Sequence, residues 1–429
     1  MDHLPDELLR AIFCETITLP RAVLNRDRVY SLEANATLAA QPYLLAAVSH
    51  RWREVSLDTA ELWAYIPLLW RADSLPLAFI AQNLARSGNQ PLIIVLKALN
   101  CRDPLFSSAL QLFVEHARRW LRVHIRLDKS SHGLINSQFM KACASCAMPV
   151  LEELIIDTGE PSHAITVFEP NKLIDCPSLV RLTNHVGILT PTTTLGTLKY
   201  LSLSIRNTTE APLWQALEMV PSLEHLEVYF PLDDDYDEQV SLAPKHDIYL
   251  PLLTSFALIG EPPMDLPWFE RLHIPNLMAL TLSIDSCHRL GMLYQTLRSP
   301  NLHLTLMPDR CGSSGTLFAA DAEELKVLRG VSTLEIFGFR EKLSDDDFFW
   351  TLETSAQEDA SCWAAKFTPL VLRDCSFDTE AIKQIAQFVR MRASITATES
   401  TAPRLDVYWI ACLHDEDDVE PKWLSDQWI

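Results

Sequence analysis

The sequence predicts an α+β or α/β solenoid: a small N-terminal helical region, then an irregular array of repeats whose strands form a parallel, concave sheet. Two observations lead to this prediction. An apolar triplet at offsets 0, 3 and 5 recurs along most of the chain, and proline often stands two residues before its first member. Ahead of this array, the segments LPDELLRAIF and LLAAVSHRWREV carry apolar residues at helical spacing.

The first segment has the features of a helix start. Pro5 suits the first helical position because its missing N–H would be unpaired there, and acidic residues follow in the first turn. A second helix is expected to carry Leu44, Val48, Trp52 and Val55, and the short segment TAELWAYI offers Leu62 and Trp63. Three short helices bury too little core to stand alone. We therefore expect this region either to cap the next domain or to dock on a partner.

Three motifs stand together in the first 95 residues. They are Leu4-Pro5-x-Glu7-Leu8-Leu9-x-x-Ile12-Phe13, then Val48-Ser49-x-x-Trp52-Arg53, then Leu62-Trp63. Together they resemble the F-box, and the later segment Leu84-Ala85-Arg86-Ser87-Gly88-Asn89-Gln90-Pro91-Leu92 resembles one found in fungal F-box proteins. The resemblance implies binding to a Skp-type adaptor of a cullin–RING ubiquitin ligase through Leu4, Pro5, Leu8, Ile12, Val48, Trp52, Leu62 and Trp63.

The apolar triplet defines the repeats. It is clearest at Leu151-Leu154-Ile156, Leu198-Leu201-Leu203, Leu223-Leu226-Val228, Leu253-Phe256-Leu258 and Leu277-Leu280-Leu282, with weaker copies that begin at Trp120, Leu179, Val331 and Phe367. The copies are about 19–30 residues apart, close to the period of leucine-rich repeats. Stacked units would share one core beside a parallel sheet. The array resembles the divergent leucine-rich repeats of fungal F-box proteins; an ordinary α/β domain with leucine-rich strands is the alternative.

These features predict four regions. Residues 1–70 form the F-box helical domain, in which residues 14–43 are expected to be an inserted loop or an extra short helix. Residues 71–110 are a linker or the first solenoid cap. A degenerate leucine-rich-repeat solenoid follows over residues 111–412, and residues 413–429 form an acidic C-terminal tail.

Side chains at offsets 2, 4 and 6 should lie on the concave face of the sheet, because strand side chains alternate. Tyrosine and arginine are frequent in interface hot spots. This face is therefore expected to bind a protein target through Arg122, Tyr200, His225, Glu227 and Tyr229. Tyr200, His225 and Tyr229 are expected to form one patch on two neighbouring strands, and a merely solvated face is the alternative.

Bulk composition limits the partners. The chain has 429 residues, 48% of them hydrophobic, and a net charge of −20, which disfavours nucleic acid and anionic membrane surfaces as partners. Its start does not fit a secretory signal, and its most apolar short run, residues 91–99, is too short to span a bilayer. The ten cysteines are mostly isolated, so we expect a reducing cytoplasmic or nuclear compartment.

Catalytic motifs are missing from the sequence. It contains no G-x-S-x-G, P-loop or H-E-x-x-H pattern, and Cys143-Ala144-Ser145-Cys146 lacks a second ligand pair for zinc. We therefore expect no catalytic residue, metal or cofactor. The sequence predicts the substrate-recognition subunit of an SCF-type ubiquitin ligase with an unidentified protein target. The alternative is an adaptor-independent repeat scaffold or protein-interaction module.

Overall fold

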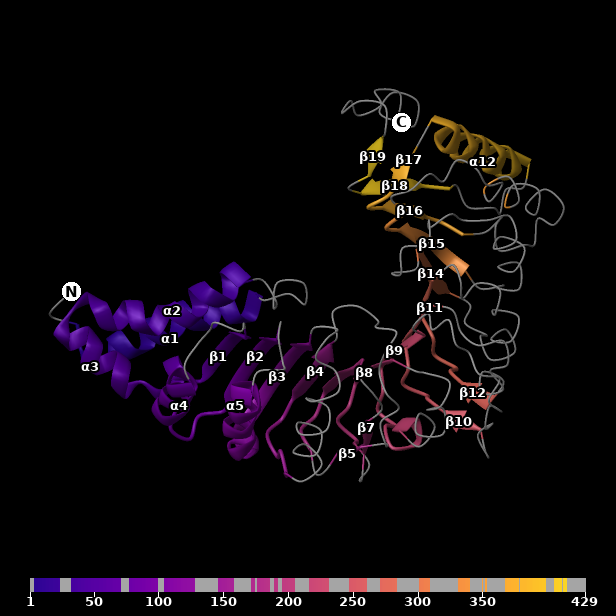
Figure 1. Ribbon diagram of the computed structural model, residues 1–429. Coiled ribbons are helices and arrows are strands. Elements are labelled where there is room, and N and C mark those ends of the chain that lie inside the picture. Colours follow the sequence, from indigo (N-terminus) through magenta and orange to yellow (C-terminus); the bar gives the residue numbers. More distant parts are fainter. Residues whose placement is uncertain are drawn as a thin grey trace. The chain divides into compact units, whose positions relative to one another are not determined.

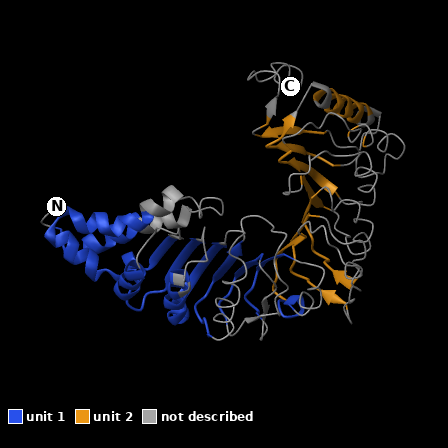
Figure 2. Ribbon diagram, in the orientation of Figure 1, with its two compact units in different colours: residues 1–204, 215–220 blue, residues 205–214, 221–429 orange. Residues whose placement is uncertain are grey.

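The structure is a computed structural model (Figure 1). It describes residues 4–23, 32–70, 77–98, 104–127, 146–157, 171–173, 176–185, 189–191, 195–204, 216–230, 247–260, 271–283, 301–308, 331–339, 349, 352, 367–377, 379–398, 405–410 and 412–414. The chain divides into two compact units (Figure 2): unit 1 comprises residues 1–204 and 215–220, and unit 2 comprises residues 205–214 and 221–429. Within the described ranges, no helix is long and apolar enough to cross a bilayer.

Thirteen of the described strands belong to one parallel sheet, and their order in the sheet follows their order in the chain. Unit 1 contributes β1 (Tyr65–Trp70), β2 (Leu92–Ala98), β3 (Trp120–Leu127), β4 (Glu153–Asp157), β6 (Arg181–Asn184) and β8 (Tyr200–Ser204). Unit 2 contributes β9 (His225–Phe230), β11 (Ser255–Gly260), β13 (Ala279–Ser283), β14 (Leu302–Met307), β15 (Val331–Phe337), β16 (Leu370–Arg373) and β18 (Val407–Ile410). One parallel strand added per repeat fits the predicted α/β solenoid.

The other elements are shorter strand pairs and helices. The pairs are β5 (Asn171–Leu173) with β7 (Leu189–Pro191), β10 (Ile248–Tyr249) with β12 (Leu272–His273), and β17 (Ser376–Phe377) with β19 (Leu413–His414). The helices are α1 (Asp6–Val23), α2 (Leu32–Val48), α3 (His50–Asp58), η1 (Ala60–Trp63), α4 (Leu77–Arg86), α5 (Pro104–Glu115), η2 (Ala117–Arg119) and α12 (Thr379–Thr398).

The predicted triplets form the core of each unit. Every triplet residue named above is at most 3% exposed. In unit 1 the second members pair in register across the strands, as Val123, Leu154, Leu182 and Leu201. In unit 2 the corresponding row is Leu226, Phe256, Leu280, Leu304, Leu334 and Leu370. The predicted strand register is therefore confirmed. We call this side of the sheet the triplet face and the opposite side the second face.

The repeat array begins earlier than the predicted boundary at residue 111. Trp63-Ile66-Leu68 is a further buried triplet at offsets 0, 3 and 5, and it leads into β1. The predicted linker or cap, residues 71–110, contains β2, which pairs with both β1 and β3. Its inward residues Leu92, Ile94 and Leu96 do not match the triplet spacing because the register shifts between Leu92 and Ile93.

For residues 14–43 an inserted loop or an extra short helix was expected, and in the described part the loop is wrong. In its described part the segment is helical, since α1 continues to Val23 and α2 begins at Leu32; residues 24–31 lie outside the described residues. Alanine and leucine, the best helix formers, are frequent in α2. The acidic tail lies outside the described residues beyond position 414.

The expected second helix is two helices, divided at Ser49. The Ser49 side chain accepts a hydrogen bond from the N–H of Trp52 at 3.1 Å and caps the start of α3. Leu44 and Val48 therefore lie on α2, and Trp52 lies on α3, so the four predicted residues do not form one apolar stripe. A serine at this position favours a new helix start over continuation, because its hydroxyl satisfies a terminal backbone N–H.

The N-terminal helices are joined to the sheet by an apolar contact. Leu38 of α2 packs with Tyr65, Ile93 and Val95, which lie on the second face of β1 and β2. Figure 1 shows α4 and α5 on the other side of these strands. The helical region is thus part of unit 1, and Leu38 covers part of the second face of β1 and β2.

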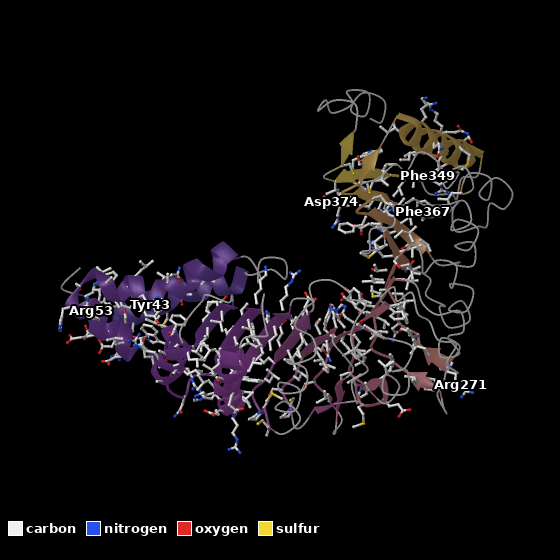
Figure 3. All side chains as sticks on the ribbon, in the orientation of Figure 1. Tyr43, Arg53, Arg271, Phe349, Phe367 and Asp374 are labelled. Atoms are coloured by element: carbon white, nitrogen blue, oxygen red, sulfur yellow. The ribbon has the colours of Figure 1, made fainter. Side chains whose placement is uncertain are left out.

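The segment that resembles the fungal motif connects the helices to the first strands. The guanidinium of Arg86 lies 4.4 Å from the Trp63 ring centroid and 5.9 Å from that of Tyr43, a residue labelled in Figure 3. Ser87 Oγ accepts a hydrogen bond from Arg119 at 2.7 Å, and Gly88 has a φ of +53°. Glycine adopts this left-handed conformation with little strain, which lets the chain turn from α4 toward β2.

Candidate functional site

Large apolar side chains are exposed on the three N-terminal helices. Leu8 and Ile12 of α1 are 51% and 47% exposed, and Leu44 and Val48 of α2 are 62% and 61% exposed. Leu57 of α3 is 39% exposed. We call these five residues the apolar helical set. Several such side chains on neighbouring helices mark a candidate protein-interaction site.

A compact core of other residues holds the same helices together. Leu9, Phe13 and Val55 are buried together with Leu62 and Trp63. Trp63 donates its indole N–H to the carbonyl of Ser56 at 2.8 Å, and its ring meets Tyr43 edge-on at 5.0 Å.

The predicted adaptor-binding residues therefore divide into three groups. Pro5, Leu8, Ile12 and Val48 are exposed. Leu4 and Trp52 are half-buried and pack against the core, with the Trp52 ring 4.8 Å from that of Phe13. Leu62 and Trp63 are each 1% exposed. These last two hold the helices together, and a partner docked on this conformation would not touch them.

Arg51 fixes the first turn of α1. Its guanidinium donates to Asp6 Oδ1 at 2.7 Å and also to the carbonyl oxygen of Leu4. The Leu4–Pro5 entry to the helix is therefore tied to α3, which keeps the predicted docking residues of α1 in a defined position.

On the second face of unit 1, the candidate residues Arg122 and Tyr200 lie in one row with Glu153 and Arg181. Glu153 lies 3.0 Å from His124 Nε2 and 3.3 Å from Arg181 Nε, and the Arg181 guanidinium lies 4.3 Å from the Tyr200 ring centroid. Burial acts to raise the pKa of Glu153, but the hydrogen bond from His124 and the neighbouring positive charges outweigh it and lower that pKa. This row can offer arginine and tyrosine to a partner.

The middle row of the same face is buried, which sequence reasoning did not anticipate. His124, Thr183 and Ser202 are 8%, 1% and 0% exposed. Their side chains lie between rows that contain longer arginine, lysine and tyrosine residues, and these longer side chains restrict access to the sheet surface. On the second face of unit 1, only the outer rows are therefore available for contact.

One hydrogen-bonded chain in this region has the order of a hydrolase triad. His185 Nδ1 lies 3.4 Å from Asp157 Oδ1, and its Nε2 lies 3.0 Å from Ser202 Oγ. The fully buried Ser202 hydroxyl has no access to a substrate carbonyl. In this conformation the hydrogen bonds of His185, which directly follows β6, connect that strand to Asp157 of β4 and Ser202 of β8. They do not present the Ser202 hydroxyl as a nucleophile.

The unit 2 candidates lie on β9. His225 is exposed, whereas Glu227 and Tyr229 are half-buried, and the Tyr229 hydroxyl donates to Glu227 at 3.4 Å. Small residues of β11, Ser255 and Ala257, pair with His225 and Glu227. Tyr200 belongs to unit 1, so a joint patch with His225 and Tyr229 remains a prediction.

Sequence reasoning missed a charged cluster on the second face of unit 2. Glu335 of β15 lies 3.0 Å from His303 Nε2 of β14 and 3.1 Å from Arg373 Nε of β16. The neighbouring side chains Tyr408 and Ile410 of β18 are 51% and 41% exposed. A register shift after Leu302 removes the triplet spacing from β14, but the period-2 pattern Leu302-Leu304-Leu306 could have identified this strand.

We expect Glu335→Gln to reduce the loss of stability in acid. The hydrogen bond from His303 lowers the pKa of Glu335 below its ordinary 4.5, against the opposing effect of burial and with help from Arg373. The ionised carboxylate therefore stabilises the fold above pH 4.5, and this contribution disappears as pH falls through the lowered pKa. Urea titrations between about pH 6 and about pH 3 should show the parent–variant difference shrinking. A constant difference would contradict the assignment.

The described residues contain no group of three His, Cys, Asp or Glu side chains that could hold a metal ion. Of the C-x-x-C pair, Cys146 is half-buried, and Cys143 lies outside the described residues. Comparison of the chain with protein-family models finds no matching family, and comparison with curated proteins finds no match either.

Proposed function

We propose that this chain is a substrate-recognition subunit of a cullin–RING ubiquitin ligase. The N-terminal helices bind a Skp-type adaptor, and the second face of the repeats binds a protein target. The observation that carries the proposal is the apolar helical set, which stands exposed on helices that a separate buried core already holds together.

Helix α2 supplies the clearest support. Its residue Leu38 is 4% exposed and packs on the sheet, whereas Leu44 and Val48, farther along the same helix, are more than 60% exposed. A region that only capped the solenoid would bury such side chains. Leaving large apolar side chains in water is unfavourable by about 25 cal/mol per Å² of apolar area, and docking on a partner removes that cost.

The proposed activity requires no chemistry from this chain. A receptor that holds the adaptor at one end and the target at another raises the effective concentration of the target near the ubiquitin-conjugating enzyme. The ligase then transfers ubiquitin in a nearly intramolecular reaction. The exposed Arg122 and the half-buried Tyr200 and Tyr229 of the second face would supply contacts to the target.

An adaptor-independent repeat scaffold is the second candidate. The packing of Leu38 against Tyr65 and Val95 favours it, because this is the contact that a solenoid cap makes. The two candidate functions differ in what they require of the apolar helical set. The ligase subunit needs these exposed residues to bind the adaptor, whereas the scaffold does not need them to be exposed.

The full chain should bind a purified Skp-type adaptor, and Leu8→Ala combined with Val48→Ala should weaken that binding at least about tenfold. Truncation of apolar side chains that become buried at an interface commonly costs this much or more. Calorimetric titration of the adaptor into each full-length protein measures the change. Leu105→Ala is the matched control, because Leu105 is 53% exposed on α5, outside the apolar helical set.

Equal affinities of the double variant and the parent would reject the apolar helical set as the docking site. A parent that does not bind the adaptor at all would reject the ligase assignment and favour the scaffold. Loss of binding in the Leu105 control as well would also count against the assignment, since it would show that exposed leucines matter wherever they lie.

A further inference from the structure

Two cysteines lie side by side near the end of unit 2. Cys375 directly precedes β17 and Cys412 directly precedes β19, and these strands pair in parallel with Ser376 opposite Leu413. Neighbouring strands are about 4.8 Å apart. This separation falls within the range of about 4.4–6.8 Å between Cα atoms that a disulfide needs.

A tight turn holds Cys375 in this place. Asp374, labelled in Figure 3, has a φ of 52°, and its N–H donates to the carbonyl of Ile410 at 2.9 Å. An aspartate tolerates this left-handed conformation better than most residues. The turn connects β16 to β17 and ties the chain just before Cys375 to the chain just before Cys412.

The two thiols contact each other but differ in exposure. Cys375 is 1% exposed, and its Sγ lies 3.4 Å from the carbonyl oxygen of Ile336; Cys412 is half-buried, with its Sγ 3.3 Å from that of Leu372. A hydrogen bond also joins the two thiols. An accessible thiol beside a buried one is the usual arrangement of an attacking and a resolving cysteine.

The hydrogen bond makes the two thiols chemically unequal. The Cys375 S–H group lowers the pKa of Cys412 to about 7, against the opposing effects of burial and of Asp374. The same interaction raises the pKa of Cys375, and burial adds to that effect. The lowered pKa increases the share of Cys412 that is thiolate, the form that attacks disulfides.

We propose that Cys375 and Cys412 form an oxidant-sensitive dithiol, which small disulfides such as oxidised glutathione convert to an intramolecular disulfide. The Cys412 thiolate attacks one sulfur of oxidised glutathione and breaks its S–S bond, and one glutathione thiolate leaves and takes a proton from water. Cys375 then loses its proton to water and attacks the Cys412 sulfur, which releases the second glutathione. Two protein thiols are oxidised, and one small disulfide is reduced to two thiols.

The first step prepares the second. Once Cys412 is in a mixed disulfide it carries no negative charge and no longer accepts the Cys375 hydrogen bond, so both of these reasons for the raised pKa of Cys375 disappear. The resulting bond would covalently join the repeat of β16 and β17 to that of β18 and β19. It would thereby fix the end of the second face that carries Arg373, Tyr408 and Ile410.

Trypsin digestion of the full chain provides a direct test. Residues 374–383 and 405–422 form two tryptic peptides with one cysteine each. After incubation of the folded protein with oxidised glutathione and alkylation of free thiols, mass spectrometry should detect these two peptides linked, and dithiothreitol should separate them. Cys375→Ser should instead leave Cys412 carrying one glutathione, and Cys412→Ser should leave Cys375 unmodified.

Cys146→Ser, which changes a half-buried cysteine of unit 1, is the matched control and should leave the linked peptide unchanged. The proposal is rejected if the parent protein retains glutathione on Cys412 without forming the link. It is also rejected if the link appears only after addition of denaturant, since the contact would then not belong to the folded chain. Circular dichroism confirms that each variant is folded before the reaction.

Discussion

Phe256→Ala is expected to destabilise unit 2 by about 3–5 kcal/mol, the usual cost of emptying a buried phenylalanine site. Phe256 is 0% exposed and lies between Leu226 of β9 and Leu280 of β13 in the central row of the triplet face. In a stacked array each inward side chain supports both neighbouring repeats, so the cavity should affect three strands together. Urea unfolding followed by circular dichroism measures the change in free energy.

Ser255→Ala is the matched control for this change. Ser255 precedes Phe256 on the same strand, but its side chain lies on the second face and is half-exposed. Its replacement should change stability by no more than about 0.5 kcal/mol. Hydrogen exchange should locate the added opening of Phe256→Ala in β9, β11 and β13. A larger effect at Ser255 than at Phe256 would overturn the assigned register.

The sequence contained enough information to place most of the sheet. Each triplet puts one apolar residue just before a strand and two on the same side of it, so register follows from the alternation of side chains. The triplet spacing is absent at Leu92 and Leu302, where a register shift leaves the buried apolar residues at alternate positions. The triplet Trp63-Ile66-Leu68 was not predicted, because it overlaps the helical motif.

The helical region shows a different limit. Apolar spacing predicted the helix over residues 44–55, but the Ser49 cap breaks it, and a hydroxyl that satisfies one backbone N–H outweighed continuity of the pattern. Spacing also cannot separate apolar side chains that form the local core from those left outside it. Leu62 and Leu8 were both predicted to bind the adaptor, yet Leu62 is 1% and Leu8 is 51% exposed.

The candidate contacts of the second face depend on pairing between distant segments. Glu335 meets His303 and Arg373 because three strands lie in register, although the partners are 32 and 38 positions away in the chain. Cys375 and Cys412 meet for the same reason. Alternation predicted which face would carry Arg122 and His225, but it could not predict which side chains would pair there or that His124 would be buried.

Trp63→Ala is expected to cost about 3–5 kcal/mol as well, and it should act mainly on α1, α3 and η1. The change removes a side chain that is 1% exposed, together with its hydrogen bond to Ser56 and its contacts with Tyr43 and Arg86. Hydrogen exchange should rise in these helices, and urea unfolding should show the loss. Trp63→Phe retains most of the apolar volume and should recover part of the stability.

The same variant distinguishes a positioning role from direct contact. Trp63 belongs to the buried core that holds these helices, so under the proposed function Trp63→Ala weakens adaptor binding by unfolding the docking helices. An osmolyte such as trimethylamine N-oxide favours the folded state and should restore the binding. Leu8→Ala removes an exposed contact, so the osmolyte should not restore its binding to the adaptor.

Trp120→Ala is the matched control, because Trp120 is also buried and also donates its indole N–H to a carbonyl seven residues earlier, that of Phe113. With the osmolyte present, persistent loss of binding in Trp63→Ala but not in Trp120→Ala would show that Trp63 contacts the adaptor directly, which this packing does not allow.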